Sequence, residues 1–108
     1  MNPAPRAFGF DFTVGNTHPA LPGHFPGNPV VPGALLLSHV LAGVSSELNR
    51  TVSAVKQVKF TAPLLPDETA IVDCEARADE LRFAVQATRA GNRVSVASGT
   101  LTLGSGAT

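Results

Sequence analysis

The first regular pattern in the chain is an alternation of hydrophobic with small or polar residues near its beginning. Every second position carries a large apolar side chain: Phe8, Phe10, Phe12 and Val14. Successive side chains of a strand point to opposite faces of its sheet. The alternation therefore predicts a strand with one buried face.

Proline and glycine then dominate the chain from residue 15 to residue 33. This stretch contains five prolines and four glycines. Proline removes a donor and fixes φ, and glycine permits positive φ, so neither helix nor strand is expected to run through it. Loops of this length are uncommon in compact domains and usually indicate function or disorder. Phe25, Val30 and Val31 favour an ordered loop.

A long hydrophobic run follows the loop and predicts a helix over about residues 34–48. The run is too long for a typical buried strand and is rich in good helix formers. Its large apolar residues cover most of the helical circumference: Leu35, Leu36, Leu37, Val40, Leu41 and Val44. A helix of this kind is expected to be central and surrounded by protein.

The second half of the chain alternates again and predicts the rest of a sheet. The first of these strands carries Val58, Phe60 and Ala62 and ends at the prolines that follow. Two further alternating runs cover residues 70–76 and 81–87, with a turn at Asp79-Glu80 between them.

A change of parity marks the last predicted strand, which follows a turn at Gly91-Asn92. Val94 and Val96 occupy even positions, whereas Leu101 and Leu103 occupy odd ones. Such a switch predicts a β-bulge, which we expect near Gly99.

These elements predict an α+β fold in which an antiparallel sheet wraps around one apolar helix. We expect a single domain over residues 1–108, with residues 1–5 and 104–108 frayed. The chain has 108 residues, of which 44% are hydrophobic and 15% charged, so it can bury a core.

Charge and cysteine content exclude several classes of function. Eight Lys and Arg balance eight Asp and Glu, so binding to nucleic acid or to an anionic membrane is not expected, whereas self-association is. Cys74 is the sole cysteine, and the three histidines form no metal-binding motif, so we expect no metal and no cofactor. Without a signal peptide pattern or a long apolar run, a cytoplasmic protein without a membrane span is predicted.

Residues 21–37, LPGHFPGNPVVPGALLL, form the most informative segment of the sequence. This segment resembles the signature of the 3-hydroxyacyl-acyl-carrier-protein dehydratases (FabA/FabZ-like), in which a GHFPG turn is followed by a P-x-x-PG step into the central helix. The resemblance continues through residues 58–67. It implies a hotdog fold, usually dimeric, with active sites at the protomer interface. The implied partner is an acyl carrier protein whose phosphopantetheine carries the acyl thioester.

The resemblance assigns roles to residues of the loop and of the helix start. His24 matches the family histidine that removes a proton from C2 of the acyl group, and a neutral imidazole suits that step. The Gly33 N–H lies where the helix begins, so it can polarise the thioester carbonyl. Four neighbouring residues are expected to contact substrate: Phe25, Gly27, Pro32 and Ala34.

Ser38 departs from the family pattern. The fifth residue after the helix-start glycine is a Glu or Asp in the dehydratases, and serine is a far poorer proton donor. Sequences with this departure resemble the dehydratase-like proteins of aryl-polyene lipid clusters. Three routes stay open: His24 returns the proton with the help of a water held by Ser38, another subunit supplies a carboxylate, or activity is lost.

Three functions therefore remain for the chain. The first is dehydration of a 3-hydroxyacyl thioester in fatty-acid or polyene lipid synthesis. The second is hydrolysis of an acyl thioester, because hotdog proteins share thioester binding across several reactions. The third is a catalytically degenerate acyl-binding subunit of a heteromeric dehydratase. The assembly is expected to be a homodimer, a higher oligomer, or a heterodimer with a related hotdog subunit. We expect His39 at the subunit interface or in a core hydrogen bond.

Overall fold

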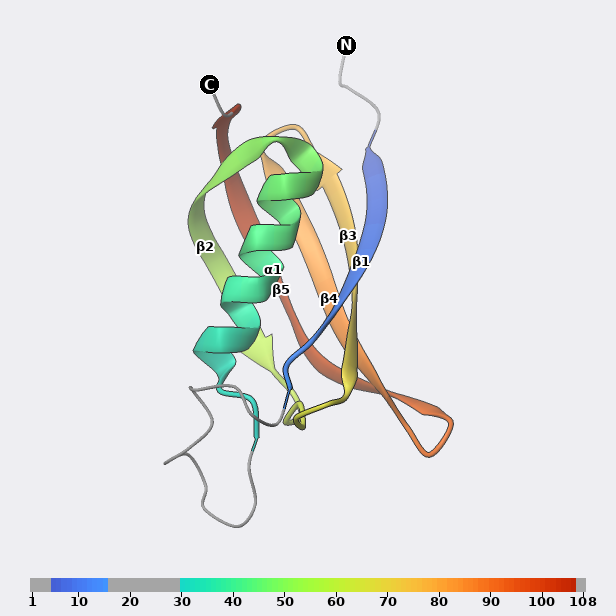
Figure 1. Ribbon diagram of the computed structural model, residues 1–108. Helices are drawn as coiled ribbons and strands as arrows, with labels where there is room; N and C mark the ends of the chain where they lie inside the picture. The colour runs from blue at the N-terminus through green and yellow to red at the C-terminus, as the bar shows by residue number, and fades with distance from the viewer. Residues whose placement is uncertain (1–4, 16–29, 107–108) are drawn as a thin grey trace.

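One helix lies along one face of a five-stranded sheet (Figure 1). The structure is a computed structural model that describes residues 5–15 and 30–106. The elements in chain order are β1 (Arg6–Thr13), α1 (Gly33–Leu48), β2 (Arg50–Phe60), β3 (Thr69–Arg77), β4 (Glu80–Arg89) and β5 (Asn92–Gly106). All the strand pairs are antiparallel, in the order β1-β3-β4-β5-β2. The predicted α+β architecture is confirmed.

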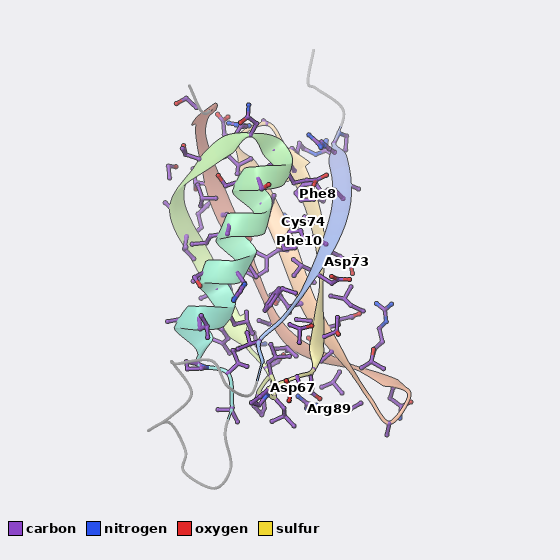
Figure 2. The ribbon with its side chains drawn as sticks, in the orientation of Figure 1. Phe8, Phe10, Asp67, Asp73, Cys74 and Arg89 are labelled. Atoms are coloured by element: carbon purple, nitrogen blue, oxygen red, sulfur yellow. The ribbon has the colours of Figure 1, made fainter. Side chains whose placement is uncertain are left out.

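The core lies between α1 and the sheet. Leu36, Val40 and Val44 of α1 are buried against alternate residues of β3, β4 and β5. Cys74 belongs to this core, as predicted, and Figure 2 shows it with Phe10 near the helix. Burial raises the pKa of the Cys74 thiol to about 12, so the thiol is neutral and packs as a small apolar side chain.

The helix is less enclosed than its sequence indicates. Exposed residues form a stripe along the side of α1 away from the sheet: Ala34, Ser38, Ala42 and Ser46. The leucines beside this stripe are only half-buried, because the sheet covers one side of α1. Within the single chain, the described residues therefore enclose α1 on one side only. Within those residues, no helix combines the length and the hydrophobicity needed to span a membrane.

The predicted bulge in β5 is present, but it lies earlier than expected. Pairing between β4 and β5 shifts register after Val85, which pairs with Ala97, so Val96 is the extra residue. Both Val96 and Ala97 are buried. Gly99 has a different role: a Cβ there would overlap the Gln57 carbonyl oxygen of β2. Glycine at this position therefore allows two strands to approach closely.

Several element boundaries differ from the prediction. β2 begins at Arg50 and ends at Phe60, so Ala62 lies beyond the strand. Both hairpin turns lie one residue earlier than expected, at residues 78–79 and 90–91. Ala78 and Ala90 take positive φ values of 55° and 50°, which the geometry of the turns requires. Alanine is not a residue that signals such a φ value in a sequence.

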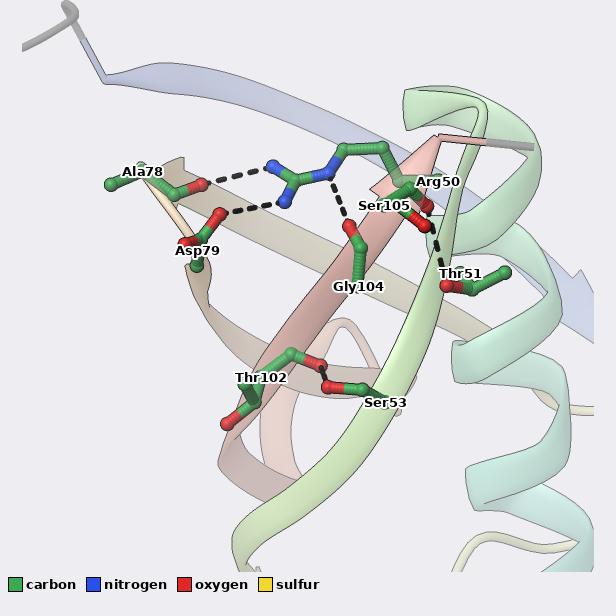
Figure 3. Close-up of polar contacts among 8 residues, drawn as sticks. All are labelled: Arg50, Thr51, Ser53, Ala78, Asp79, Thr102, Gly104 and Ser105. Carbon is green, nitrogen blue, oxygen red and sulfur yellow. Dashed lines mark hydrogen bonds and ion pairs between the residues drawn. The ribbon is translucent and has the colours of Figure 1, made fainter. Parts of the chain in front are cut away.

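Arg50 fastens the far end of β5 (Figure 3). Its guanidinium donates to the Gly104 carbonyl at 2.9 Å, to the Ala78 carbonyl at 3.0 Å and to Asp79 Oδ1 at 2.8 Å. Charged donors make the stronger hydrogen bonds of a protein. β5 therefore continues to Gly106, and the expectation that the chain frays from residue 104 is wrong for residues 104–106.

Candidate active site

A pocket of about 450 Å³ opens where α1 begins and β2 ends. Its described lining comes from the segment before the helix, from the first turns of the helix and from the turn after β2: Val30, Val31, Pro32, Gly33, Leu36, Phe60, Thr61, Ala62, Pro63 and Leu64. Apolar side chains dominate this lining. Its size lies in the range of small-ligand sites, which are mostly apolar with a few placed polar groups.

The start of α1 supplies those polar groups. The first hydrogen bond of the helix runs from the Leu36 N–H to the Pro32 carbonyl at 3.0 Å. The N–H groups before Leu36, including that of Gly33, have no acceptor within the helix. Pro32 is the N-cap residue, and no described side chain caps this end. The arrangement suits an oxygen that carries partial negative charge, such as a polarised carbonyl.

Phe60 faces this helix start from the end of β2. A Cβ built on Gly33 would lie 3.0 Å from Phe60 Cζ, so the ring rests against the glycine. Sequence reasoning gave Phe60 no role in the site. Its segment was part of the resemblance, and alternation gave Phe60 only a place on a predicted strand. The ring is instead 50% exposed at the pocket.

Backbone hydrogen bonds fix the turn after β2, which forms one wall of the pocket. The Val31 N–H donates to the Leu64 carbonyl at 2.8 Å and so joins the segment before α1 to the turn after β2. The Val96 carbonyl accepts from the N–H groups of Thr61 and Ala62, at 2.8 and 3.3 Å. Val96 is the bulge residue, so the irregularity in β5 anchors the pocket wall.

An ion pair between β4 and the residues just before β3 fixes the same turn. The Arg89 guanidinium donates to both oxygens of Glu68, at 2.6 and 2.8 Å, and also to the Pro63 carbonyl. Glu68 in turn accepts the Leu65 N–H at 2.8 Å. Figure 2 shows Arg89 beside Asp67, the neighbour of Glu68, at this end of the sheet. The hydrogen bond from Arg89 lowers the pKa of Glu68 despite the opposing effect of burial.

Replacing Glu68 with glutamine is expected to lower the free energy of unfolding by about 1–2 kcal/mol at neutral pH. Glutamine keeps an acceptor for the Leu65 N–H but loses the charge that pairs with Arg89. Because the folded pKa of Glu68 is depressed, the stabilisation is present above the ordinary carboxyl pKa. It is lost as pH falls through the folded value.

Chemical denaturation at pH 7 and near pH 3 measures this difference. The chain has no Trp or Tyr, so circular dichroism is the suitable signal. Glu75→Gln is the matched control, because Glu75 is exposed and makes no side-chain hydrogen bond to the described residues. A deficit in Glu68→Gln that stays constant across this pH range would contradict the role of the charge.

The predicted site residues are only partly within the described chain. His24, Phe25 and Gly27 lie outside the described residues, so their roles stay predictions. Pro32 and Gly33 line the pocket together. Ala34 does not belong to the described lining and is exposed on the outer side of α1.

Ser38 lies on the exposed stripe of α1 and outside the described lining of the pocket. Its hydroxyl donates to the Leu35 carbonyl of the same helix at 2.7 Å. In this rotamer the hydroxyl proton of Ser38 is used in that hydrogen bond, while the hydroxyl oxygen can still accept another. The neighbouring His39 stacks on Phe12 of β1, with ring centroids 4.7 Å apart. Within the described residues, no group of three His, Cys, Asp or Glu could hold a metal ion.

Residues 2–100 of the chain match the family described as ApeI-like, ApeI dehydratase. The chain belongs to the ApeI-like dehydratase family. The resemblance to FabZ-like dehydratases is thus confirmed for the family. The hotdog fold is confirmed with it.

The individual relatives of this ApeI-like chain share only a moderate part of its sequence. A 3-hydroxyacyl-[acyl-carrier-protein] dehydratase FabZ of Acetivibrio thermocellus is 30% identical over 90 residues, which cover 75% of this chain and 61% of the relative. The chain thus spans about three fifths or less of the length of the curated relatives it matches.

Two solved structures share the fold over nearly the whole chain. An uncharacterized protein from Erwinia carotovora subsp. atroseptica superposes with a TM-score of 0.80 at 19% identity, over 97% of this chain and 95% of that one. The dehydratase heterocomplex ApeI:P from Xenorhabdus doucetiae gives a TM-score of 0.74 at 19% identity, over 95% and 96%.

Proposed function

We propose that this protein removes water from 3-hydroxyacyl groups carried as thioesters on an acyl carrier protein, giving the 2-enoyl thioester. The observation that carries the proposal is the apolar pocket at the start of α1 in a chain of the ApeI-like dehydratase family. A FabZ relative that is named for this reaction supports the proposed substrate class. The expected setting is fatty-acid or polyene lipid synthesis.

In the proposed reaction, the thioester carbonyl oxygen accepts a hydrogen bond from the Gly33 N–H. Negative charge develops on that oxygen when His24 removes a proton from C2, and the positive end of the helix stabilises it. The C2 electrons then form the double bond to C3 as the 3-hydroxyl leaves. The hydroxyl takes up a proton and departs as water. The apolar lining contributed by Leu36 and Leu64 accommodates the acyl chain.

Protonation of the leaving hydroxyl is the step for which this chain lacks the family acid. Ser38 holds its proton on the Leu35 carbonyl, so it can accept a hydrogen bond from a water but does not donate in this rotamer. Two of the open routes supply the proton without Ser38 as its donor. In one, His24 returns the proton through such a water; in the other, a carboxylate comes from a second subunit.

A second hotdog subunit is part of the proposal. β2 is an edge strand of the described sheet, and Val55 on it is 40% exposed. An edge strand with apolar side chains is a template for pairing with another strand. The exposed stripe of α1 offers a further surface. A match to the structure of a dehydratase heterocomplex supports a related subunit as the partner, and a second copy is the alternative.

Mass spectrometry of carrier-bound substrates tests the proposal. Purified protein is incubated with 3-hydroxyacyl carrier thioesters, alone and with a related hotdog subunit. We expect a mass loss of about 18 Da, the mass of water. Release of free carrier thiol without loss of water would instead identify a thioesterase.

The variant Ser38→Glu separates the remaining possibilities. If the wild-type protein is active alone, a carboxylic acid in the chain is expected to raise turnover or leave it unchanged. If the wild-type protein is inactive and Ser38→Glu dehydrates, the chain is a degenerate subunit whose acid comes from its partner. No loss of water under any of these conditions would refute a dehydratase.

A further inference from the structure

Phe60 occupies an unusual position for a large apolar side chain. It ends β2, and half of its surface is exposed. Its ring rests on Gly33, with Cζ and Cε1 at 3.0 and 3.2 Å from the place of a Cβ. Because the exposed ring lines the pocket, it is available for contact with an apolar part of a ligand.

Among the large side chains of the described lining, Phe60 is the one that has room to change its rotamer. Leu36 and Leu64 are 2% and 1% exposed and are held by the core. The remaining members of the lining are small or cyclic side chains or backbone. A half-exposed ring can change rotamer at little cost, whereas a fully packed leucine cannot.

We propose that Phe60 determines the length of the acyl chain that this pocket accepts, and that its ring favours short chains over long ones. The inference rests on the proposed function, in which the thioester carbonyl lies at the Gly33 N–H. An acyl group that extends from that point within the pocket meets the ring. Phe60 therefore occupies volume that a long acyl chain needs as it extends from Gly33.

The size of the effect follows from the burial of methylenes. Each additional buried methylene strengthens binding by about fourfold, the equivalent of ~0.8 kcal/mol. Removing the ring makes room for several of them. We therefore expect Phe60→Ala to raise the ratio of long-chain to short-chain affinity at least about tenfold, and Phe60→Leu to have an intermediate effect.

Two readouts keep this inference separate from the reaction itself. The first is calorimetric binding of S-(2-oxoalkyl)pantetheine thioethers with short and long alkyl chains, which keep a carbonyl but have no 3-hydroxyl to lose. The second is dehydration of 3-hydroxybutyryl and 3-hydroxydecanoyl carrier protein. Phe8→Ala is the matched control, because Phe8 is a half-buried phenylalanine on β1, the opposite edge strand.

The outcomes are distinct. An affinity ratio that rises in Phe60→Ala and not in Phe8→Ala supports the role of Phe60, even if wild-type protein dehydrates nothing and the proposed function fails. An unchanged ratio overturns it, even if wild-type protein is an active dehydratase. A change in subunit number by light scattering, with an unchanged ratio, assigns Phe60 to a subunit contact and also overturns it.

Discussion

His24→Ala is expected to reduce the rate of dehydration by about 10²–10⁴-fold, the usual contribution of general acid–base catalysis. The reason is that the proposed mechanism gives His24 the proton of C2. With no carboxylate at Ser38, the same imidazole is also a candidate to return a proton to the leaving hydroxyl. Mass spectrometry of the 2-enoyl product under single-turnover conditions measures the loss.

His39→Ala is the control for this substitution. His39 lies beside Ser38 on α1, but its ring stacks on Phe12 and it does not belong to the described lining of the pocket. Its removal is expected to cost some stability and little activity. Equal activity losses in the two variants would contradict the assignment of His24, as would full activity in His24→Ala.

Gly99→Ala is expected to lower the free energy of unfolding by about 3 kcal/mol or more. A Cβ at this position would overlap the Gln57 carbonyl and would lie 2.9 Å from the ring of Phe83. The carbonyl belongs to the backbone of β2, so it cannot rotate away. The pairing of β5 with β2 must open instead.

Thermal and denaturant unfolding, followed by circular dichroism, measure this loss. Gly15→Ala is the control, because a Cβ there has a single neighbour among the described residues, Asp67 Oδ1 at 4.0 Å. The control is expected to change stability by less than about 0.5 kcal/mol. Normal stability of Gly99→Ala would show that β2 and β5 tolerate separation at this point.

Local patterns were enough to predict most of the fold. The alternation around Phe10 indicates a strand with one buried face, and the hydrophobic run around Val40 indicates a buried helix. Both patterns can be read from residues close together in the sequence. The middle of β2, residues 53–57, carries no such alternation, because this edge strand is exposed on both faces there. Only its pairing with β5 makes it a strand, and a distant segment supplies that pairing.

The family motif gave the expected place of the candidate site. Gly33 is in the described lining of the pocket, and its role there stays a prediction. Phe60 was missed because its contact with Gly33 joins residues far apart in the sequence. The location of the bulge was missed for a related reason. Gly99 is a glycine because β2 approaches it, and that requirement cannot be seen in the local sequence of β5.

The bulge at Val96 also determines where β5 tolerates a change of length. Leu101 and Leu103 face the core only because one extra residue precedes them. Deleting a residue between Gly99 and Leu101 would turn Leu101 and Leu103 to the outer face of the sheet. Deleting Val96 or Ala97 would leave an uninterrupted alternation along the strand. The bulge is thus the place in β5 where homologues can differ by one residue and still keep the same core.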